Sequence, residues 1–184
     1  MAKLAGMREY YTKPIKNYIW IVLAFTAIIF AMSSPWHYLH SVSGKTFFAL
    51  FAPVSESVWE HLKIVFYPFL ITFFAGYFVI KRWLDLDAKA YFVGATMGTL
   101  LCLWLVASNF YFFHFAFAIG NSLALDLIIE IISIFLGVCW AFHLEKRLAP
   151  CVIKTIVCAC LLLTFAILFG VFAFYPPSAP LFSA

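Results

Sequence analysis

The chain has 184 residues, of which 66% are hydrophobic and 11% charged, whereas a soluble domain carries about 25% charged residues. This composition excludes a soluble globular domain and predicts an all-α integral membrane protein, a single domain over residues 1–184. The formal net charge is +4, but Lys and Arg occur in short clusters between apolar runs, which argues against nucleic acid as a partner.

Apolar runs predict a bundle of about five transmembrane helices. We expect them at residues 18–34, 57–82, 90–113, 122–144 and 153–175. Pro35 is expected to end the first helix, because proline lacks a backbone donor and its ring clashes with the preceding turn. Residues 44–54 are too short to cross a bilayer and are expected to form a re-entrant or interfacial segment.

Two local patterns refine this picture. Ser57 and Glu60 have the spacing of a capping box, which predicts that the second helix starts at this point. Gly94 and Gly98 are four residues apart in the third helix, a spacing that lets a neighbouring helix approach closely. Both patterns are interpreted as structural.

The distribution of basic residues predicts the orientation. Ten of the 12 Lys and Arg residues lie before the first helix or in alternate connections, while the opposite connections hold only Lys45 and Lys63. Basic residues favour the cytoplasmic side. We therefore expect a multi-pass protein of the plasma (inner) membrane, with a cytoplasmic N-terminus and an extracytoplasmic C-terminus.

The fourth helix carries a polar stripe. Asp126, Glu130, Ser133 and Gly137 recur at helical spacing within an apolar segment. A carboxylate inside a bilayer costs about 2.5–3.5 kcal/mol, so Glu130 needs a cation, a proton or a strong donor. Asp126 lies in the first turn, where its negative charge also favours the helix N-terminus.

A second polar group lies at the start of the second helix. Glu56 and Glu60 share a helical face if the helix extends to them, and His61 and Trp59 lie beside them. Alternatively, Glu60 pairs with Lys63 one turn on as an ordinary surface ion pair, worth a few tenths of a kcal/mol. In that case the segment is only a well-capped helix start.

The sharper hypothesis joins both groups into one pocket on the outer side of the membrane. Oxygen and imidazole ligands would suit a divalent metal such as zinc, manganese or iron. The candidate metal ligands are His37, His40, Glu60, His61, His114, Asp126 and Glu130, and the other candidate ligand contacts are Glu56, Trp59, Lys63 and Asn109.

Two segments carry a resemblance to a known family. Residues 53–63 have the sequence Pro-Val-Ser-Glu-Ser-Val-Trp-Glu-His-Leu-Lys, and residues 174–182 have Phe-Tyr-Pro-Pro-Ser-Ala-Pro-Leu-Phe. They resemble a family of small uncharacterised prokaryotic polytopic membrane proteins, a domain of unknown function. Its hallmark is Pro-Val-Asn-Glu-Ser-x-Trp-Glu-His-Leu-Lys, and its members end with two prolines, a histidine and Pro-Leu-Phe.

This chain departs from that pattern at Ser55, in place of Asn, and at Ser178, in place of His. Either change removes a potential ligand or donor. The resemblance implies a shared outer-face feature built from the helix start and the tail, and it implies no activity.

Three functions remain open. The first is a transport-related subunit whose outward pocket binds a cation or a small cationic ligand. The second is a metal-dependent intramembrane hydrolase acting on a lipid or peptide, with Glu56 or Glu60 as general base. The third is a structural or assembly protein. Membrane lipids are expected partners, and a carrier of so few helices would need a homo-oligomer or a partner membrane protein.

Overall fold

The computed structural model describes residues 16–117, 119 and 122–182. Every regular element in these ranges is helical, as the sequence predicts. The five long helices are α2 (Lys16–Ser43), α3 (Val58–Ile80), α4 (Ala88–Tyr111), α5 (Leu123–Arg147) and α6 (Val152–Phe174). The short elements are η1 (Thr46–Leu50), η2 (Phe112–Ala116) and η3 (Pro180–Phe182). Each long helix has the length and hydropathy needed to cross a membrane, which makes the chain a multi-pass membrane protein.

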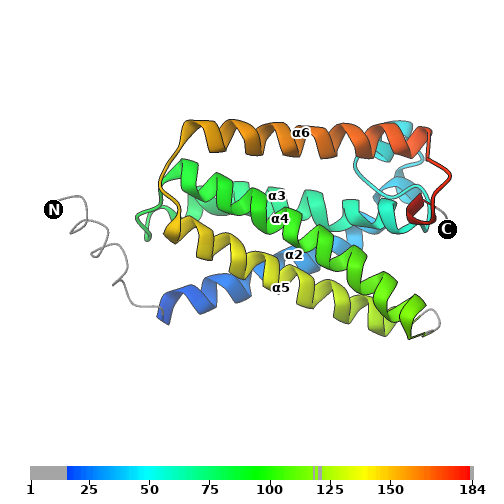
Figure 1. The fold of residues 1–184 in the computed structure, drawn as a ribbon, viewed down its shortest axis with the longest axis horizontal. Coiled ribbons are helices and arrows are strands. Elements are labelled where there is room, and N and C mark those ends of the chain that lie inside the picture. Colours follow the sequence, from blue (N-terminus) through cyan, green and yellow to red (C-terminus); the bar gives the residue numbers. More distant parts are fainter. Residues whose placement is uncertain (1–15, 118, 120–121, 183–184) are drawn as a thin grey trace.

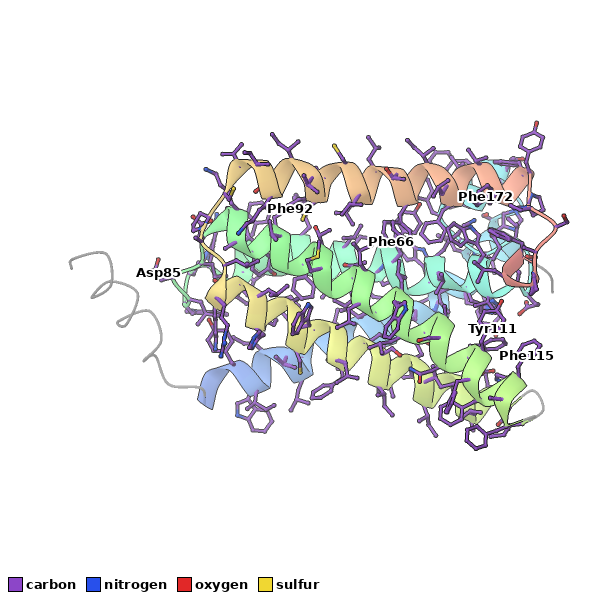
Figure 2. All side chains as sticks on the ribbon, in the orientation of Figure 1. Phe66, Asp85, Phe92, Tyr111, Phe115 and Phe172 are labelled. Carbon is purple, nitrogen blue, oxygen red and sulfur yellow. The ribbon has the colours of Figure 1, made fainter. Side chains whose placement is uncertain are left out.

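The helices form an elongated bundle (Figure 1). α3 and α4 occupy its middle, α6 runs along one side, and α2 and α5 lie on the other. α3 begins and α6 ends at the same end of the bundle, which we call the motif end because residues 53–63 and the tail both lie there. Asp85, in the turn between α3 and α4, lies at the opposite end from Phe172 (Figure 2).

α4 and α5 pack closely through glycines. A Cβ atom on Gly98 would lie 2.5 Å from the carbonyl oxygen of Gly137, and one on Gly137 would lie 2.7 Å from that of Gly98. A Cβ atom on Gly94 would meet the carbonyl oxygen of Ala141 at least as closely. The predicted packing role of Gly94 and Gly98 is confirmed, because any side chain there would push the helices apart.

α6 is the most peripheral of the long helices. Ile153 and Leu163 are exposed, as expected for side chains that face lipid. Its inner contacts are aromatic: the rings of Phe66 on α3 and Phe169 on α6 have centroids 5.2 Å apart. Phe66 lies between the two helices in Figure 2.

The end of the first helix differs from the sequence expectation. α2 does not stop at residue 34 but continues through Pro35 to Ser43. Gly44 ends it with a φ of 62°, a left-handed conformation that glycine adopts without steric cost. One proline removes one backbone hydrogen bond, and tertiary contacts hold the turns that follow, since Trp36 Nε1 donates to the carbonyl of Phe51 at 3.0 Å.

Candidate functional site

The start of α3 is fixed by serine capping. Ser57 is the N-cap, and its Oγ accepts the backbone N–H of Glu60 at 3.4 Å. The predicted helix start is therefore confirmed. The reciprocal half of the capping box does not form, because the Glu60 side chain is bound elsewhere and the Ser57 N–H lies 3.5 Å from Ser55 Oγ instead.

Glu60 and Lys63 form a buried ion pair rather than a surface pair. Lys63 Nζ donates to Glu60 Oε2 at 2.7 Å and to the carbonyl of Ala49 at 2.9 Å. The Glu60 side chain is 4% exposed and that of Lys63 is 0% exposed. Oε2 also accepts the backbone N–H of Val54 at 2.9 Å. This pair locks the segment before α3 onto the helix, a role that excludes the weak surface interaction considered from the sequence.

Three side chains converge on the side of the α3 start that faces away from the Glu60–Lys63 pair. His37 Nε2 on α2 lies 3.1 Å from His61 Nε2 on α3. Glu56 Oε2, in the connection before α3, lies 3.3 Å from His61 Nε2 and 3.9 Å from His37 Nε2. We call these three residues the His-Glu cluster. One ligand atom from each lies within 4.8 Å of the others, a grouping that can hold a metal ion.

The imidazole of His61 is oriented by its own helix. His61 Nδ1 lies 3.0 Å from the carbonyl oxygen of Ser57. A carbonyl oxygen only accepts, so Nδ1 carries a proton, and Nε2 is the ring nitrogen available to a metal ion. Metal-binding histidines are commonly held in this way through the second ring nitrogen.

The His-Glu cluster opens into a cavity of about 700 Å³. Asp126 and Glu130 of α5 line it, together with residues of α2, α3 and α4. Glu130 is 8% exposed and its Oε1 has no hydrogen-bond partner among the described residues. The predicted α5 stripe therefore does face protein, with Ser133 buried below Glu130.

Several candidate residues lie outside the His-Glu cluster. His114 Nε2 lies 2.9 Å from Asp126 Oδ1, and the amide of Asn109 donates to the carbonyl of Leu105 within its own helix. Asn109 and His114 do not line the cavity, and His40 does not belong to the cluster.

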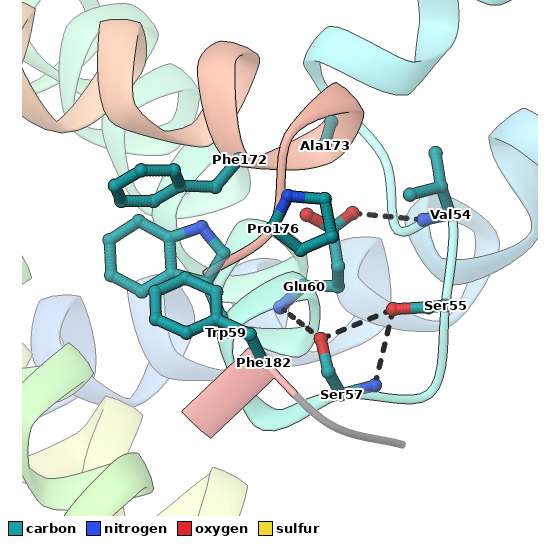
Figure 3. Close-up of a pocket in the computed structure, with 9 residues that line it drawn as sticks. All are labelled: Val54, Ser55, Ser57, Trp59, Glu60, Phe172, Ala173, Pro176 and Phe182. Atoms are coloured by element: carbon teal, nitrogen blue, oxygen red, sulfur yellow. Dashed lines mark hydrogen bonds between the residues drawn. The ribbon is translucent and has the colours of Figure 1, made fainter. Parts of the chain in front are cut away.

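A second, smaller cavity lies beside the start of α3, with its own set of lining residues (Figure 3). Trp59 and Glu60 line it, with Phe172 and Pro176 from the end of α6 and Phe182 from η3. The expectation of one pocket is thus corrected. Neighbouring residues on a helix point about 100° apart, so Glu60 and His61 belong to different cavities.

The resemblance implies that the tail, with Pro176 and Phe182, belongs to one outer-face feature with the helix start, although it names no single tail residue as a ligand contact. Phe172 lies before that tail segment, and no sequence signal marked it. The structure explains why both segments stand out, because η3 packs against the start of α3, with the rings of Trp59 and Phe182 5.2 Å apart.

Comparison with known proteins gives one family. The model of DUF6512, described as a family of unknown function, matches residues 8–184. The chain belongs to this family. No curated protein and no solved structure matches it. Membership of an uncharacterised family is confirmed, while the motif shared by its members and their prokaryotic origin stay predictions.

Proposed function

We propose that this membrane protein binds a divalent transition-metal cation, zinc by ligand type, at His37, Glu56 and His61. The cavity beside them would admit the ion from the motif end of the bundle, which the distribution of basic residues predicts to lie outside the cytoplasm. A transport-related role follows from an ion site that is open to one membrane face and lined by carboxylates.

The spacing of the ligand atoms carries this proposal. In a tetrahedral zinc site with bonds of about 2.0–2.1 Å, two ligand atoms lie about 3.3–3.4 Å apart. The three separations in the His-Glu cluster are 3.1, 3.3 and 3.9 Å. Two imidazoles and a carboxylate form a donor set that suits zinc better than calcium or magnesium.

The ligands come from two helices and one connection, and their exposure differs. The side chain of Glu56 is 75% exposed, against 27% for His37 and 28% for His61. The histidines are therefore the more fixed part of the site, and Glu56 can swing toward or away from an ion. Such a site favours exchange of the ion over permanent retention.

Glu130 adds a buried carboxylate to the same cavity. A carboxylate at that depth is stabilised by a cation or a proton. We infer that Glu130 holds a proton or attracts the ion deeper into the bundle. With five helices, transport through the membrane would require an oligomer or a partner protein.

The test is zinc binding by the purified protein in detergent, measured by isothermal titration and elemental analysis. His61→Ala should weaken zinc binding by more than about 100-fold, because it removes a direct ligand. His40→Ala is the matched control, since His40 lies on α2 one turn beyond His37 but outside the cluster. Equal affinity in both variants would refute the metal site.

A metal-dependent hydrolase is the second candidate. The observation that favours it is the number of protein ligands: three leave one position of a tetrahedral site open, as in catalytic zinc sites. A bound zinc ion supplies a nucleophile at neutral pH by acidifying a water molecule. Glu60 is engaged with Lys63 and lies outside this cavity, so Glu130 would replace it as general base.

Reconstituted vesicles distinguish the two candidates. Entry of zinc into vesicles containing the protein, lost in His61→Ala, would support transport. Zinc-dependent cleavage of lipid or peptide without ion uptake would support the hydrolase.

A further inference from the structure

The smaller cavity at the motif end has features of a binding site of its own. Its volume is about 180 Å³, several times the share of about 30 Å³ that one water occupies in the liquid. Sites for drug-sized molecules begin at about 300 Å³. The cavity therefore has the size for a small chemical group.

Two buried polar atoms on residues that line this cavity have no partner among the described residues. They are Trp59 Nε1 and Glu60 Oε1, on residues that are 7% and 3% exposed. In Figure 3, the dashed line to Val54 ends on one oxygen of Glu60, and the other oxygen points away from Val54, toward the side on which the indole nitrogen of Trp59 lies. Leaving such groups unpaired costs free energy, so both indicate a ligand.

The donor and acceptor define that ligand. Glu60 Oε1 requires a hydrogen-bond donor, and Trp59 Nε1–H requires an acceptor. The rings of Phe172 and Phe182 flank the indole with centroids 5.5 and 5.2 Å away, and aromatic faces attract cations. An ammonium group satisfies both the carboxylate oxygen and the rings.

The charge balance restricts the ligand further. Lys63 already neutralises Glu60 through Oε2, so the two side chains together carry no net charge. A ligand that carries an ammonium at one end and an anionic oxygen at the other matches it without leaving a buried net charge.

The position of the cavity indicates where such a ligand would come from. It lies where α3 begins and α6 ends, which is the level of the lipid head groups for helices that cross a membrane. We propose that this cavity binds a phosphoethanolamine group, with the ammonium on Glu60 Oε1 and a phosphate oxygen on Trp59 Nε1. The group comes either from a phosphatidylethanolamine head group or from the soluble phosphodiester glycerophosphoethanolamine, both of which carry no net charge. The proposal is independent of metal binding.

The experiment compares ethanolamine with choline, whose quaternary ammonium has no N–H donor. In the lipid arm, the protein is reconstituted with equal phosphatidylethanolamine and phosphatidylcholine, and retained lipid is measured by native mass spectrometry. In the soluble arm, glycerophosphoethanolamine and glycerophosphocholine are titrated into the protein in a maltoside detergent. The wild type should prefer the ethanolamine form about tenfold or more in at least one arm, as expected for one charge-assisted hydrogen bond. The arm in which this preference occurs identifies the source.

Trp59→Phe keeps a ring and removes the N–H, and it should abolish most of the retention. Trp104→Phe is the control, because Trp104 is exposed on α4 away from this cavity. Folding of the Trp59 variant is checked by its helical content and its thermal unfolding midpoint, neither of which depends on metal binding. Phe182→Leu, which removes a flanking ring, is the second variant and should weaken binding.

No ethanolamine preference of the wild type in either arm would overturn the proposal, whether or not the variants fold. Equal retention by a folded Trp59→Phe protein would also overturn it, and so would a high-resolution map that shows only water between Trp59 and Glu60.

Discussion

Two adjacent residues, Glu60 and His61, face two different cavities, and the contrast between these regions explains the motif end. On one side, Glu60 is buried and paired with Lys63 at 2.7 Å. On the other, Glu56 is mostly exposed and lies beside two imidazoles. A carboxylate with a fixed cationic partner stabilises the fold, whereas a carboxylate that lacks such a partner can bind an ion.

The same contrast separates the Glu60–Lys63 pair of α3 from the pair that His114 forms with Asp126 of α5. The Glu60–Lys63 pair is inaccessible to solvent, while the second pair is partly exposed, with 6% of the His114 side chain and 41% of the Asp126 side chain accessible. Burial makes a charge pair costly to break, and exposure makes it nearly neutral.

Lys63→Met should destabilise the protein by about 3–5 kcal/mol, because it leaves the carboxylate of Glu60 buried without its cation. The measurement is unfolding in mixed detergent micelles, followed by circular dichroism. Lys45→Met is the matched control: Lys45 is exposed in the connection before η1, so a change within about 0.5 kcal/mol is expected. Equal losses in the two variants would show that Glu60–Lys63 does not stabilise the fold.

Gly98→Ala should cost about 1–3 kcal/mol, the usual cost of overpacking, because the added Cβ meets the carbonyl oxygen of Gly137 at 2.5 Å. The same unfolding assay applies. Gly170→Ala on α6 is the control, since its Cβ would meet only the end of the flexible Leu50 side chain, at 3.2 Å. A stable Gly98→Ala protein would mean that α5, which carries the acidic wall of the larger cavity, is not held by this contact.

Glu130→Gln should weaken zinc binding about tenfold, or about 1.4 kcal/mol, because it removes a negative charge from the cavity but no atom of the His-Glu cluster. Isothermal titration measures the change. Glu145→Gln is the control, because Glu145 is a buried carboxyl near the other end of α5. A loss as large as that of His61→Ala would make Glu130 a direct ligand and would extend the site.

Asp126→Asn should change stability by less than about 1 kcal/mol, because the Asp126 carboxylate is 41% exposed and water can replace its contact with His114. The thermal unfolding midpoint of the purified protein is sufficient to detect a larger effect. A loss of stability comparable to that of Lys63→Met would mean that the partly exposed His114–Asp126 pair stabilises the fold as much as the buried Glu60–Lys63 pair does.

Local sequence patterns predicted much of the architecture. Apolar runs identified the five membrane helices, the Ser57 cap marked the start of α3, and the Gly94 and Gly98 pair marked the contact with α5. Each depends on neighbouring residues within one element, so the sequence contains the required information. The predicted end of α2 at residue 34 was wrong, because a local pattern does not contain tertiary contacts. Pro35 weakens the helix locally, but contacts such as the hydrogen bond from Trp36 to Phe51 outweigh that loss.

The arrangement of the sites depended on longer distances. His37 and His61 are 24 residues apart, and no spacing rule connects them. Their approach follows from α2 continuing past Pro35 and from the relative rotation of α2 and α3.

The amino-acid sequence is enough to predict an all-helical membrane protein with acidic and histidine side chains at one end of its bundle, because hydropathy and helical periodicity are local properties. The packing of the helices fixes which carboxylate is paired, which one faces an imidazole and which cavity each one lines. Those assignments depend on how each helix is turned against its neighbours, and a rotation of one residue moves a side chain by about 100°.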